Sequence, residues 1–481
     1  MIPKIRKISE LPLERSVTYL VENPEKIKAY SFSPTEFEYV RRELSDDKDF
    51  AFVNSYFKWS FVVQPNEESK NRKEHLRKLG HKLSKSLKDQ KLQEIVLVDL
   101  LGSKDDFLAF IEGLLLSSYV FGKYKTLDQD KEKGKLLKQI EVFSDALAEE
   151  DLEQLLHVME GVYFARDLIN EPLSYLTAVQ LSKEIERKGE EAGFKVDVFS
   201  KKKLESLRFN GLLAVNKGSI DPPTFSVLEW KPENAMNKKP YIVIGKGVVY
   251  DTGGMSLKPT SYMDTMKSDM SGAASVAGLM YAIAKNKLPL YIIGFIPATD
   301  NRPDGNAYVP GDVIEMQNGV TVEVMNTDAE GRMLLADALV FAQKYTPELV
   351  FDLATLTGSA SVAVGTHGTV VMGTAEDEQF NKLEQAGDDS YERVVRFPFW
   401  DEYKEMLKST VADIKNVGGR EAGAITAGKF LEYFVDYPWI HMDIAGTAFL
   451  DKADNYRCIG GTGVGVRLLY EFFEEISRNQ K

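Results

Sequence analysis

The sequence has little cysteine and no long apolar run, and both absences narrow the kinds of protein that it can encode. Its single cysteine, Cys458, can form no disulfide within the chain and no thiolate metal cluster, which fits a reducing compartment. Residues Met1–Glu22 contain no apolar core, so we expect no signal peptide. No stretch approaches the ~18 apolar residues of a membrane span, since the most apolar one, Leu288–Ala298, is interrupted by Pro289 and Gly294. We therefore expect a cytoplasmic protein with no membrane partner.

Histidine is also scarce, and basic residues are fewer than acidic ones. None of the five histidines lies in a His-Glu-x-x-His sequence, so the commonest pattern of histidine-ligated zinc proteases is absent. His441 precedes Asp443 in an apolar stretch and fits a core histidine better than a catalytic base. Acidic residues outnumber basic ones by 73 to 60, and the net charge is −13. Such a chain repels phosphate backbones on average, which argues against nucleic acid as the main partner.

The 481 residues exceed one ordinary core, so we expect two domains. Early in the chain, Ser16–Val21 and Glu94–Leu100 are typical of buried strands, and Asp105–Lys123 has apolar residues at helical spacing. A long predicted helix, Asp151–Ile169, ends before Pro172, which cannot continue it. We place the domain boundary in this helix, which gives a smaller N-terminal α/β domain over residues 1–160 and a larger domain over residues 161–481.

The second domain alternates apolar strands with helices. Its predicted strands are apolar throughout, which indicates a mostly parallel central sheet covered by helices on both faces. Ligands of such sheets bind beyond the carboxyl ends of the strands. The expected strands are Tyr241–Val249, Leu288–Ile296, Val320–Val324 and Leu349–Ala354, and the expected helices are Met270–Lys285 and Arg332–Lys344.

Charged residues lie where these strands end. Lys246 sits inside an apolar strand and Asp251 follows it, so each needs a partner or a metal to be buried without a large cost. A plain buried ion pair would satisfy both. Asp269 directly precedes a predicted helix, where an aspartate is more often an N-terminal cap than a metal ligand.

A second acidic stretch, Asn326–Arg332, follows a predicted strand and precedes a helix. Asp328 and Glu330 are two residues apart, so in extended geometry both would project to the same side. Arg332 could neutralise them in a structural ion pair, and a bound cation would do the same.

Together, Asp251, Asp269, Asp328 and Glu330 would be untenable at neutral pH without countercharge. Two divalent metals bridged by carboxylates would resolve this repulsion. A neutral Lys246 amine could also ligate a metal, since burial and a nearby cation lower the pKa of lysine. Lys258 and Arg332 would then remain as cations for the substrate.

Two other sequence patterns suggest different chemistry and fail on inspection. Asp251-Thr252-Gly253 matches the short signature of aspartic proteases, but it occurs once and the α/β pattern disfavours that class. Gly245-Lys246-Gly247 lacks the spacer and the hydroxyl residue of a phosphate-binding P-loop.

The chain resembles the leucyl aminopeptidase family, the cytosol aminopeptidases with two metals, from Ala165 to about Leu469. The centre of the resemblance is NTDAEGR at Asn326–Arg332, which reproduces the family signature unchanged. Supporting matches are GKGVVYDTGG, SLKP at Ser256–Pro259, MKSDMSGAASV, AYVPGDV at Ala307–Val313, ATLTG at Ala354–Gly358 and DIAGT at Asp443–Thr447.

The resemblance implies a role for each matched residue. Lys246, Asp251, Asp269 and Glu330 would hold one metal, and Asp251, Asp328 and Glu330 the other, Asp328 also through its backbone carbonyl. Lys258 would polarise the scissile carbonyl, and Arg332 would hold a bicarbonate ion as general base toward a metal-bridging water. The pocket for the N-terminal side chain would be lined by Met266, Asn326, Thr355, Leu356, Gly358 and Ala445.

The resemblance further implies an exopeptidase that releases leucine and other bulky apolar residues from peptides with a free N-terminus. Its cofactors would be two divalent ions per subunit, Mn²⁺ or Zn²⁺, with Mg²⁺ and Co²⁺ also compatible with the ligands. The family forms homohexamers, and its variable N-terminal domain would serve assembly.

The chain departs from the family pattern at Met255, Ser271 and Asp300, none of which is an expected ligand. Three alternatives remain open: a DNA-binding regulatory or structural relative with the same fold, an inactive relative, and a different two-metal reaction such as phosphoester hydrolysis.

Overall fold

The computed structural model describes residues 2–12, 14–30, 32–45, 48–66, 71–127 and 136–479. The chain forms two compact units. The first comprises Met1–Met159 together with Lys452–Cys458, and the second comprises Glu160–Asp451 together with Ile459–Lys481. Within the described ranges, no helix combines the length and the apolar character needed to cross a membrane.

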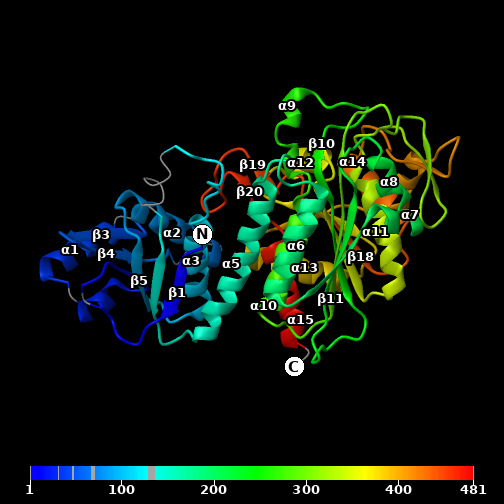
Figure 1. Ribbon diagram of the computed structural model, residues 1–481. Coiled ribbons are helices and arrows are strands. Elements are labelled where there is room, and N and C mark those ends of the chain that lie inside the picture. Colours follow the sequence, from blue (N-terminus) through cyan, green and yellow to red (C-terminus); the bar gives the residue numbers. More distant parts are fainter. Residues whose placement is uncertain are drawn as a thin grey trace. The chain divides into compact units, whose positions relative to one another are not determined.

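The first unit is built on a six-stranded sheet in the order β1-β6-β5-β2-β4-β3. Figure 1 labels β1, β3, β4 and β5 of this sheet. Its described neighbours run parallel, except that β3 and β4 form an antiparallel hairpin. The inner strands are apolar because both of their faces are covered. The strands are β1 Lys4–Lys7, β2 Val17–Val21, β3 Phe50–Ser55, β4 Lys58–Val63, β5 Glu94–Leu100 and β6 Gln139–Phe143.

The helices of this unit are η1 Pro24–Ala29, α1 Pro34–Ser45, α2 Arg72–Asp89 and α3 Lys104–Ser117. Helices α2 and α3 pack against each other, and the predicted apolar face of α3 is buried. However, α3 ends at Ser117, short of the predicted Lys123. Its last turn tightens there, since the Ser118 N–H donates to Leu115 O at 3.0 Å and both serine hydroxyls donate to carbonyls of the preceding turn.

A segment from far along the chain completes the first unit. In Lys452–Cys458, the buried Tyr456 donates its hydroxyl proton to Oε2 of Glu74 at 2.7 Å. Glu74 is a buried carboxylate in the first turn of α2, so the segment supplies a partner that a buried acid requires.

The second unit contains a nine-stranded sheet in the order β16-β15-β18-β14-β9-β11-β8-β7, with β10 also paired to β11. Pairing is parallel through β18, β14, β9 and β11, and the antiparallel pairs lie toward the edges. The strands are β7 Lys195–Phe199, β8 Thr224–Trp230, β9 Tyr241–Gly245, β10 Gly247–Asp251, β11 Ile292–Asn301, β14 Leu349–Ala354, β15 Thr369–Gly373, β16 Val394–Arg396 and β18 Trp439–Asp443.

Helices cover both faces of this sheet (Figure 1). On one face, α10 Ser271–Lys285 packs on β9, β11 and β14 and contacts α6 Ala178–Ala192 and α15 Val466–Asn479. On the other, α11 Gly331–Ala342 packs on β9 and β11 and contacts α8 Asn210–Asn216 and α14 Gly423–Glu432. The predicted mostly parallel α/β fold is therefore confirmed.

The remaining elements complete the chain. They are α5 Glu149–Asn170, in which the division between the units falls, α7 Lys201–Ser206, α9 Thr260–Met263, η2 Met266–Ser268, η3 Gln343–Tyr345, α12 Gly358–Val364, α13 Asp377–Ser390, η4 Asp401–Leu407, and strands β12 Val313–Glu315, β13 Thr321–Glu323, β17 Ile414–Lys415, β19 Phe449–Leu450 and β20 Gly460–Gly461.

Two strand predictions near the site are wrong in detail. Tyr241–Val249 is not one strand, because the chain divides at Lys246: β9 pairs with both β14 and β11, whereas β10 pairs with β11 alone. The carboxyl edge of β14 is thereby left open beside Lys246. The predicted strand Val320–Val324 is β13, which belongs to a separate three-stranded sheet with β12 and β17 and not to the central one.

Candidate metal centre

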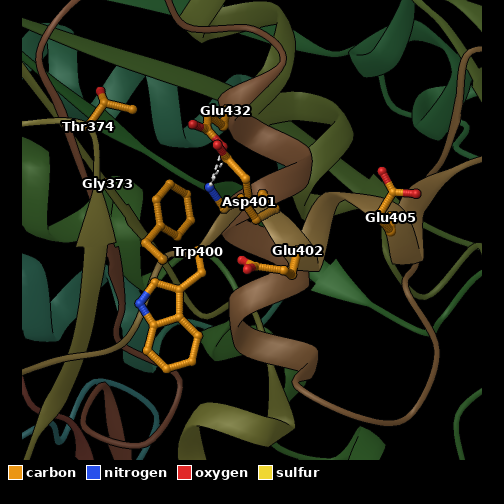
Figure 2. A pocket seen from close by; sticks show the side chains of 9 residues that line it. Gly373, Thr374, Trp400, Asp401, Glu402, Glu405 and Glu432 are labelled. Atoms are coloured by element: carbon orange, nitrogen blue, oxygen red, sulfur yellow. Dashed lines mark hydrogen bonds and ion pairs between the residues drawn. The ribbon is translucent and has the colours of Figure 1, made fainter.

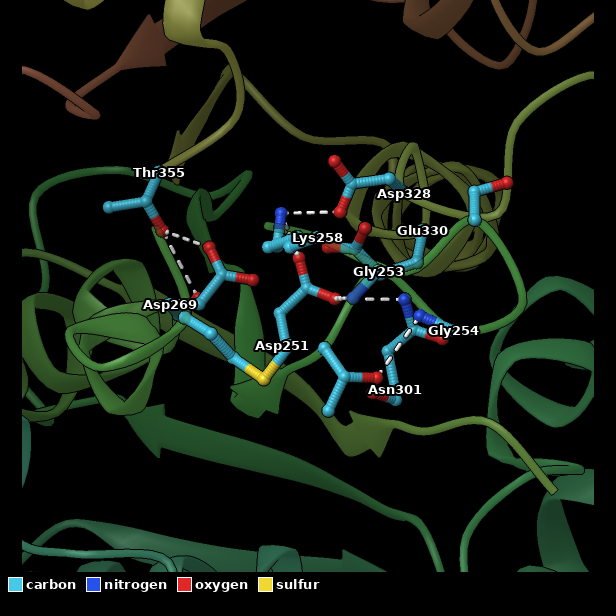
Figure 3. A network of polar contacts seen from close by, with 12 residues as sticks. Asp251, Gly253, Gly254, Lys258, Asp269, Asn301, Asp328, Glu330 and Thr355 are labelled. Atoms are coloured by element: carbon cyan, nitrogen blue, oxygen red, sulfur yellow. Dashed lines mark hydrogen bonds and ion pairs between the residues drawn. The ribbon is translucent and has the colours of Figure 1, made fainter. Parts of the chain in front are cut away.

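The candidate site lies at the carboxyl edge of the nine-stranded sheet, where several elements end side by side (Figure 3). Lys246 follows β9, Asp251 ends β10, and Thr355 follows β14. Asp269 lies between η2 and α10, while Asp328 and Glu330 directly precede α11. The expected edge of the sheet therefore gathers the expected acidic residues.

Three of these carboxylates converge closely enough to share a metal ion. Asp251, Asp328 and Glu330 each offer an oxygen, and the three oxygens lie within 4.8 Å of one another. Asp251 and Glu330 are almost completely buried, and Asp328 is half-buried. Oxygen ligands at this spacing suit a divalent cation.

Two lysines lie among the carboxylates. Lys246 Nζ is 2.8 Å from Oδ1 of Asp269 and 2.9 Å from Oε1 of Glu330. Lys258 Nζ is 2.8 Å from Oδ2 of Asp251 and also pairs with Asp328. Four carboxylates thus face two ammonium groups, so negative charge is in excess.

This excess appears in the pKa values of the acids. Burial raises the pKa of Asp328 to about 7, and the charge of Asp251 adds to the effect while Lys258 opposes it. Burial also raises the pKa of Asp269 well above its usual range, against the opposing charge of Lys246. The site therefore favours bound protons or bound cations.

The pKa of Lys246 depends on the same balance. Burial lowers it, but Asp269 and Glu330 outweigh burial and raise it above the ordinary value. The ammonium form is therefore favoured by the protein groups alone. A divalent cation between the carboxylates would reverse this balance, because its charge opposes a second positive charge nearby.

One carboxylate oxygen is left without a partner. Oδ1 of Asp269 accepts hydrogen bonds from Lys246 and from the Thr355 hydroxyl, each at 2.8 Å. Its Oδ2 is buried and has no hydrogen bond from any described residue. A buried oxygen in this state is costly unless a ligand meets it, so the residues present fit a metal beside Asp269.

One alternative considered for Asp269 and one prediction for Asp328 and Glu330 are wrong. Asp269 does not cap a helix: Met270 is the N-cap of α10, and the Asp269 side chain is held by Lys246 and Thr355 instead. Asp328 and Glu330 are not extended either, since a turn at residues 327–328 leads into helical backbone at Glu330. The turn, and not strand alternation, brings their side chains together.

Glycine makes the close approach possible at two places. A Cβ on Gly331 would lie 2.7 Å from Nζ of Lys246, so any larger residue would displace the lysine. Gly253 and Gly254 have φ of +84° and +62°, the left-handed region that allows a sharp turn after Asp251.

Arg332 lies in the first turn of α11 and forms no ion pair with the described acidic residues. Its Nη1 donates to Asn416 O at 2.6 Å, and its buried Nε has no partner in the described chain. Burial lowers its pKa to about 10, although Glu330 and Asp443 oppose the shift. The structural ion pair of Arg332 with Asp328 and Glu330, which the sequence left open, is therefore not formed.

The expected pocket residues lie around this cluster, in unequal contact with it. The Thr355 hydroxyl donates to Asp269, and the Thr355 backbone carbonyl accepts from Lys246 Nζ at 3.0 Å. Asn326 Oδ1 accepts from the Asp328 N–H at 2.9 Å. Met266 O accepts from the Asp269 N–H at 3.3 Å. Gly358 begins α12 and has no side chain to contribute.

Asp443 holds two of the other expected pocket residues, Leu356 and Ala445, a role that the sequence did not reveal. Its Oδ1 accepts the backbone N–H groups of Leu356 at 3.1 Å and Ala445 at 3.2 Å, and its Oδ2 accepts from the Thr357 hydroxyl at 2.7 Å. Asp443 thereby ties the ATLTG segment to the DIAGT segment.

Two further residues at the site escaped sequence reasoning. Asn301 ends β11, and its amide donates to Asp251 Oδ1 at 2.8 Å. Thr327 is fully buried between two loops of the site. A polar residue that ends an apolar strand is a signal that could have found Asn301; Thr327 gave no such signal.

His441 is a core residue, as its sequence context predicts. Its Nδ1 is 2.7 Å from Oδ1 of Asp352, whose Oδ2 accepts from Trp439 Nε1 at 2.7 Å. Burial lowers the pKa of His441, but Asp352 outweighs burial and raises it.

A separate hollow of about 970 Å³ lies on the second unit, beside η4 and α14 (Figure 2). Its buried Lys429 already has acidic partners, since it pairs with Asp401 at 3.2 Å and with Glu432 at 2.9 Å. The hollow contains none of the residues of the acidic cluster.

Comparison with known proteins agrees with the geometry. The "Cytosol aminopeptidase family, catalytic domain" matches residues 163–470. A "Probable cytosol aminopeptidase" of Chloroherpeton thalassium is 45% identical over 416 residues, which is 81% of each chain, and one of Chlorobium phaeobacteroides is 46% identical over 379 residues, 76% of this chain and 74% of that one.

A solved structure also matches the whole fold. The bottromycin maturation enzyme BotP in complex with Mn has a TM-score of 0.85 and 28% sequence identity, and the match covers 97% of this chain and 100% of that chain. The chain therefore belongs to the cytosol aminopeptidase family, the leucyl aminopeptidase type of metal-dependent hydrolase that removes residues from the N-terminus.

Proposed function

We propose that the protein releases leucine and other bulky apolar residues from peptides with a free N-terminus, using two divalent metal ions. The observation that carries this proposal is the convergence of the Asp251, Asp328 and Glu330 carboxylates within 4.8 Å, with Lys246 paired both to Glu330 and to Asp269.

Five residues would hold the two ions. Lys246, Asp251, Asp269 and Glu330 would hold one, and Asp251, Asp328 and Glu330 the other. The orphaned Oδ2 of Asp269 and the raised pKa of Asp328 support this assignment, since a cation would relieve both. When bound, the ions would supply Lewis acidity, which makes water a better nucleophile and polarises the scissile carbonyl. The mixed oxygen and amine ligands are compatible with Mn²⁺ or Zn²⁺.

Lys258 would act on the substrate itself. Its Asp251 and Asp328 contacts keep it charged, because they raise its pKa against the effect of burial. Preorganised positive charge stabilises the negative charge that develops on the carbonyl oxygen during acyl transfer. Lys258 would meet that oxygen.

Arg332 would hold a bicarbonate ion, whose chemistry is to accept a proton from water. The buried Nε of Arg332 lacks a partner among the described residues, which supports an anion bound beside it. A guanidinium matches a planar oxyanion through two parallel hydrogen bonds. A Lys substitution would keep the charge and lose that match.

Thr355, Leu356 and Ala445 would receive the N-terminal side chain, together with Met266, Asn326 and Gly358. Leu356 and Ala445 are both tied to Asp443, which supports a pocket of fixed shape. A rigid apolar pocket favours a large apolar side chain by about 1–3 kcal/mol per missing methylene group.

The decisive experiment measures the release of leucine from an unblocked Leu-peptide after addition of Mn²⁺ or Zn²⁺. We expect cleavage of this peptide and none of its N-acetylated form. Equal cleavage of both would refute the proposal. Metal analysis by mass spectrometry would run in parallel on the wild type and on Asp328→Ala.

Family resemblance further supports a homohexamer in the cytoplasm. Sedimentation equilibrium would test the assembly, and a monomeric mass at micromolar concentration would contradict it.

A further inference from the structure

The buried Thr327 links two loops of the site. One loop carries the proposed metal ligands Asp328 and Glu330, and the other carries Lys258, which is proposed to act on the substrate. Thr327 directly precedes Asp328 in the acidic loop. Its hydroxyl donates to Gly253 O at 2.7 Å and accepts from the Ser256 N–H at 2.8 Å. Its own N–H donates to the Ser256 hydroxyl at 3.2 Å. Ser256 lies two residues before Lys258, so hydrogen bonds in both directions hold the Lys258 loop to the Asp328 loop.

The backbone carbonyl of Thr327 is held from the opposite side. It accepts from Asn301 Nδ2 at 3.0 Å and from the Tyr308 hydroxyl at 3.0 Å. Asn301 Nδ2 also donates to Asp251. The N–H, hydroxyl and carbonyl groups of Thr327 are therefore all engaged.

Space around this joint is fully used. A Cβ on Gly254 would lie 3.1 Å from the Thr327 hydroxyl oxygen, and one on Gly253 would lie 3.0 Å from Oδ1 of Asp328. Interiors packed in this way transmit small displacements and do not absorb them. A shift of the Gly253–Ser256 turn would thus carry Lys258 with it.

We propose that Thr327 is a positioning residue, which sets the Lys258 ammonium relative to Asp328 and Glu330 through its side-chain hydroxyl. The inference rests on the proposed function of Lys258. None of the five proposed metal ligands is bonded by this hydroxyl, so its loss leaves the ligand set intact. Misplacement of a reacting group by about 1 Å costs on the order of 100-fold in rate.

The test compares Thr327→Val with Thr327→Ser. Valine keeps the volume and removes both hydroxyl hydrogen bonds, whereas serine keeps the hydroxyl. We expect Thr327→Val to lower kcat for a Leu-peptide by about 10- to 100-fold with KM changed by less than about threefold. Its metal content should equal that of the wild type, and Thr327→Ser should recover most of the rate.

Thr224→Val is the matched control. Thr224 is another buried threonine of the second unit. Its hydroxyl donates to Ala178 O in α6 at 3.2 Å and accepts from the Ser182 hydroxyl at 2.9 Å, and neither partner belongs to the acidic cluster. Thr224→Val should lower the melting temperature without lowering kcat. If Thr327→Val fails to fold, Ser256→Ala takes its place, because it removes the acceptor of the Thr327 N–H and should lower kcat by a smaller factor.

Two results would overturn the inference: a kcat for the folded Thr327 or Ser256 variant equal to that of Thr224→Val, or a loss of rate that follows a loss of bound metal. A wild-type protein with no peptidase activity would instead sink the proposed function, so the two failures are distinguishable.

Discussion

The nine-stranded sheet carries two groups of buried ionisable side chains. One group lies on the neighbouring strands β14 and β18, and the other is the candidate metal centre, which lies beyond the carboxyl ends of β9 and β10. In the first, Asp352 meets one imidazole and one indole, and both of its oxygens are occupied. In the second, four carboxylates meet two lysines, and Oδ2 of Asp269 has no partner among the described residues. The two groups differ in how fully their carboxylates are paired. Both oxygens of the structural Asp352 have hydrogen-bond partners, whereas the carboxylates of the candidate centre outnumber the lysines that face them.

Removing a carboxylate from the candidate centre should have the largest effect. Glu330→Ala should lower kcat/KM for a Leu-peptide by roughly 1000-fold, since the charge that binds the cations and orients them is lost. Metal analysis should find less than the wild-type content. An active Glu330→Ala protein with full metal content would erase the proposed distinction between the two groups.

Breaking the matched pair should instead affect stability. Asp352→Asn should lower the free energy of unfolding by about 3 kcal/mol at pH 6 and leave metal content unchanged. The folded-state pKa of His441 is raised above 6.5, so the stabilisation from the pair is complete below that pH and is lost as the pH rises through the raised pKa.

The loss should therefore be smaller at pH 9 than at pH 6. Urea unfolding of the wild type and of Asp352→Asn at both pH values measures the difference. A loss of the same size at both would mean that the pair acts through packing and not through charge.

Metal removal should lower the stability of the folded protein through the candidate centre. Dialysis against a chelator should lower the free energy of unfolding of the wild type by about 2–3 kcal/mol, relative to wild type in a metal concentration 100 times the dissociation constant. Asp328→Ala should respond less to the same treatment. Calorimetric melting with and without Mn²⁺ is the measurement, and an identical response of both proteins would count against a metal at Asp328.

The smallest effect should come from crowding the centre without changing its charge. In Gly331→Ala the new methyl group would meet the Lys246 side chain, so kcat should fall about tenfold. Gly305→Ala is a suitable control, because a Cβ at that glycine meets no atom within 4 Å. Equal rates for the two variants would show that the position of Lys246 does not matter.

Much of this arrangement could be predicted because charge in an apolar strand is conspicuous. The strands Glu94–Leu100 and Leu349–Ala354 coincide with β5 and β14, and the rule that ligands bind at carboxyl ends located the acidic residues at one edge. Where local structure decided the geometry, the sequence failed. The turn at Asp328 and the break at Lys246 depend on which strands lie alongside, and no residue type encodes that.

The neutral residues were the hardest to foresee. Thr327 and Asn301 carry no charge, and in a one-dimensional pattern they resemble many buried polar residues that bond only to their own turn. Their importance comes from partners 71 and 50 positions away. Lys258 was expected to remain, with Arg332, as a cation for the substrate, and its pairs with Asp251 and Asp328 likewise depend on tertiary contacts.

The short piece Lys452–Cys458 has a practical consequence for anyone who wishes to study the first unit by itself. A gene truncated after Met159 would encode every strand of the six-stranded sheet and still lack the phenol of Tyr456 that donates to Glu74. The missing seven-residue piece would have to be supplied as a separate peptide or grafted through a linker, because the unit that folds is not a single continuous stretch of the gene.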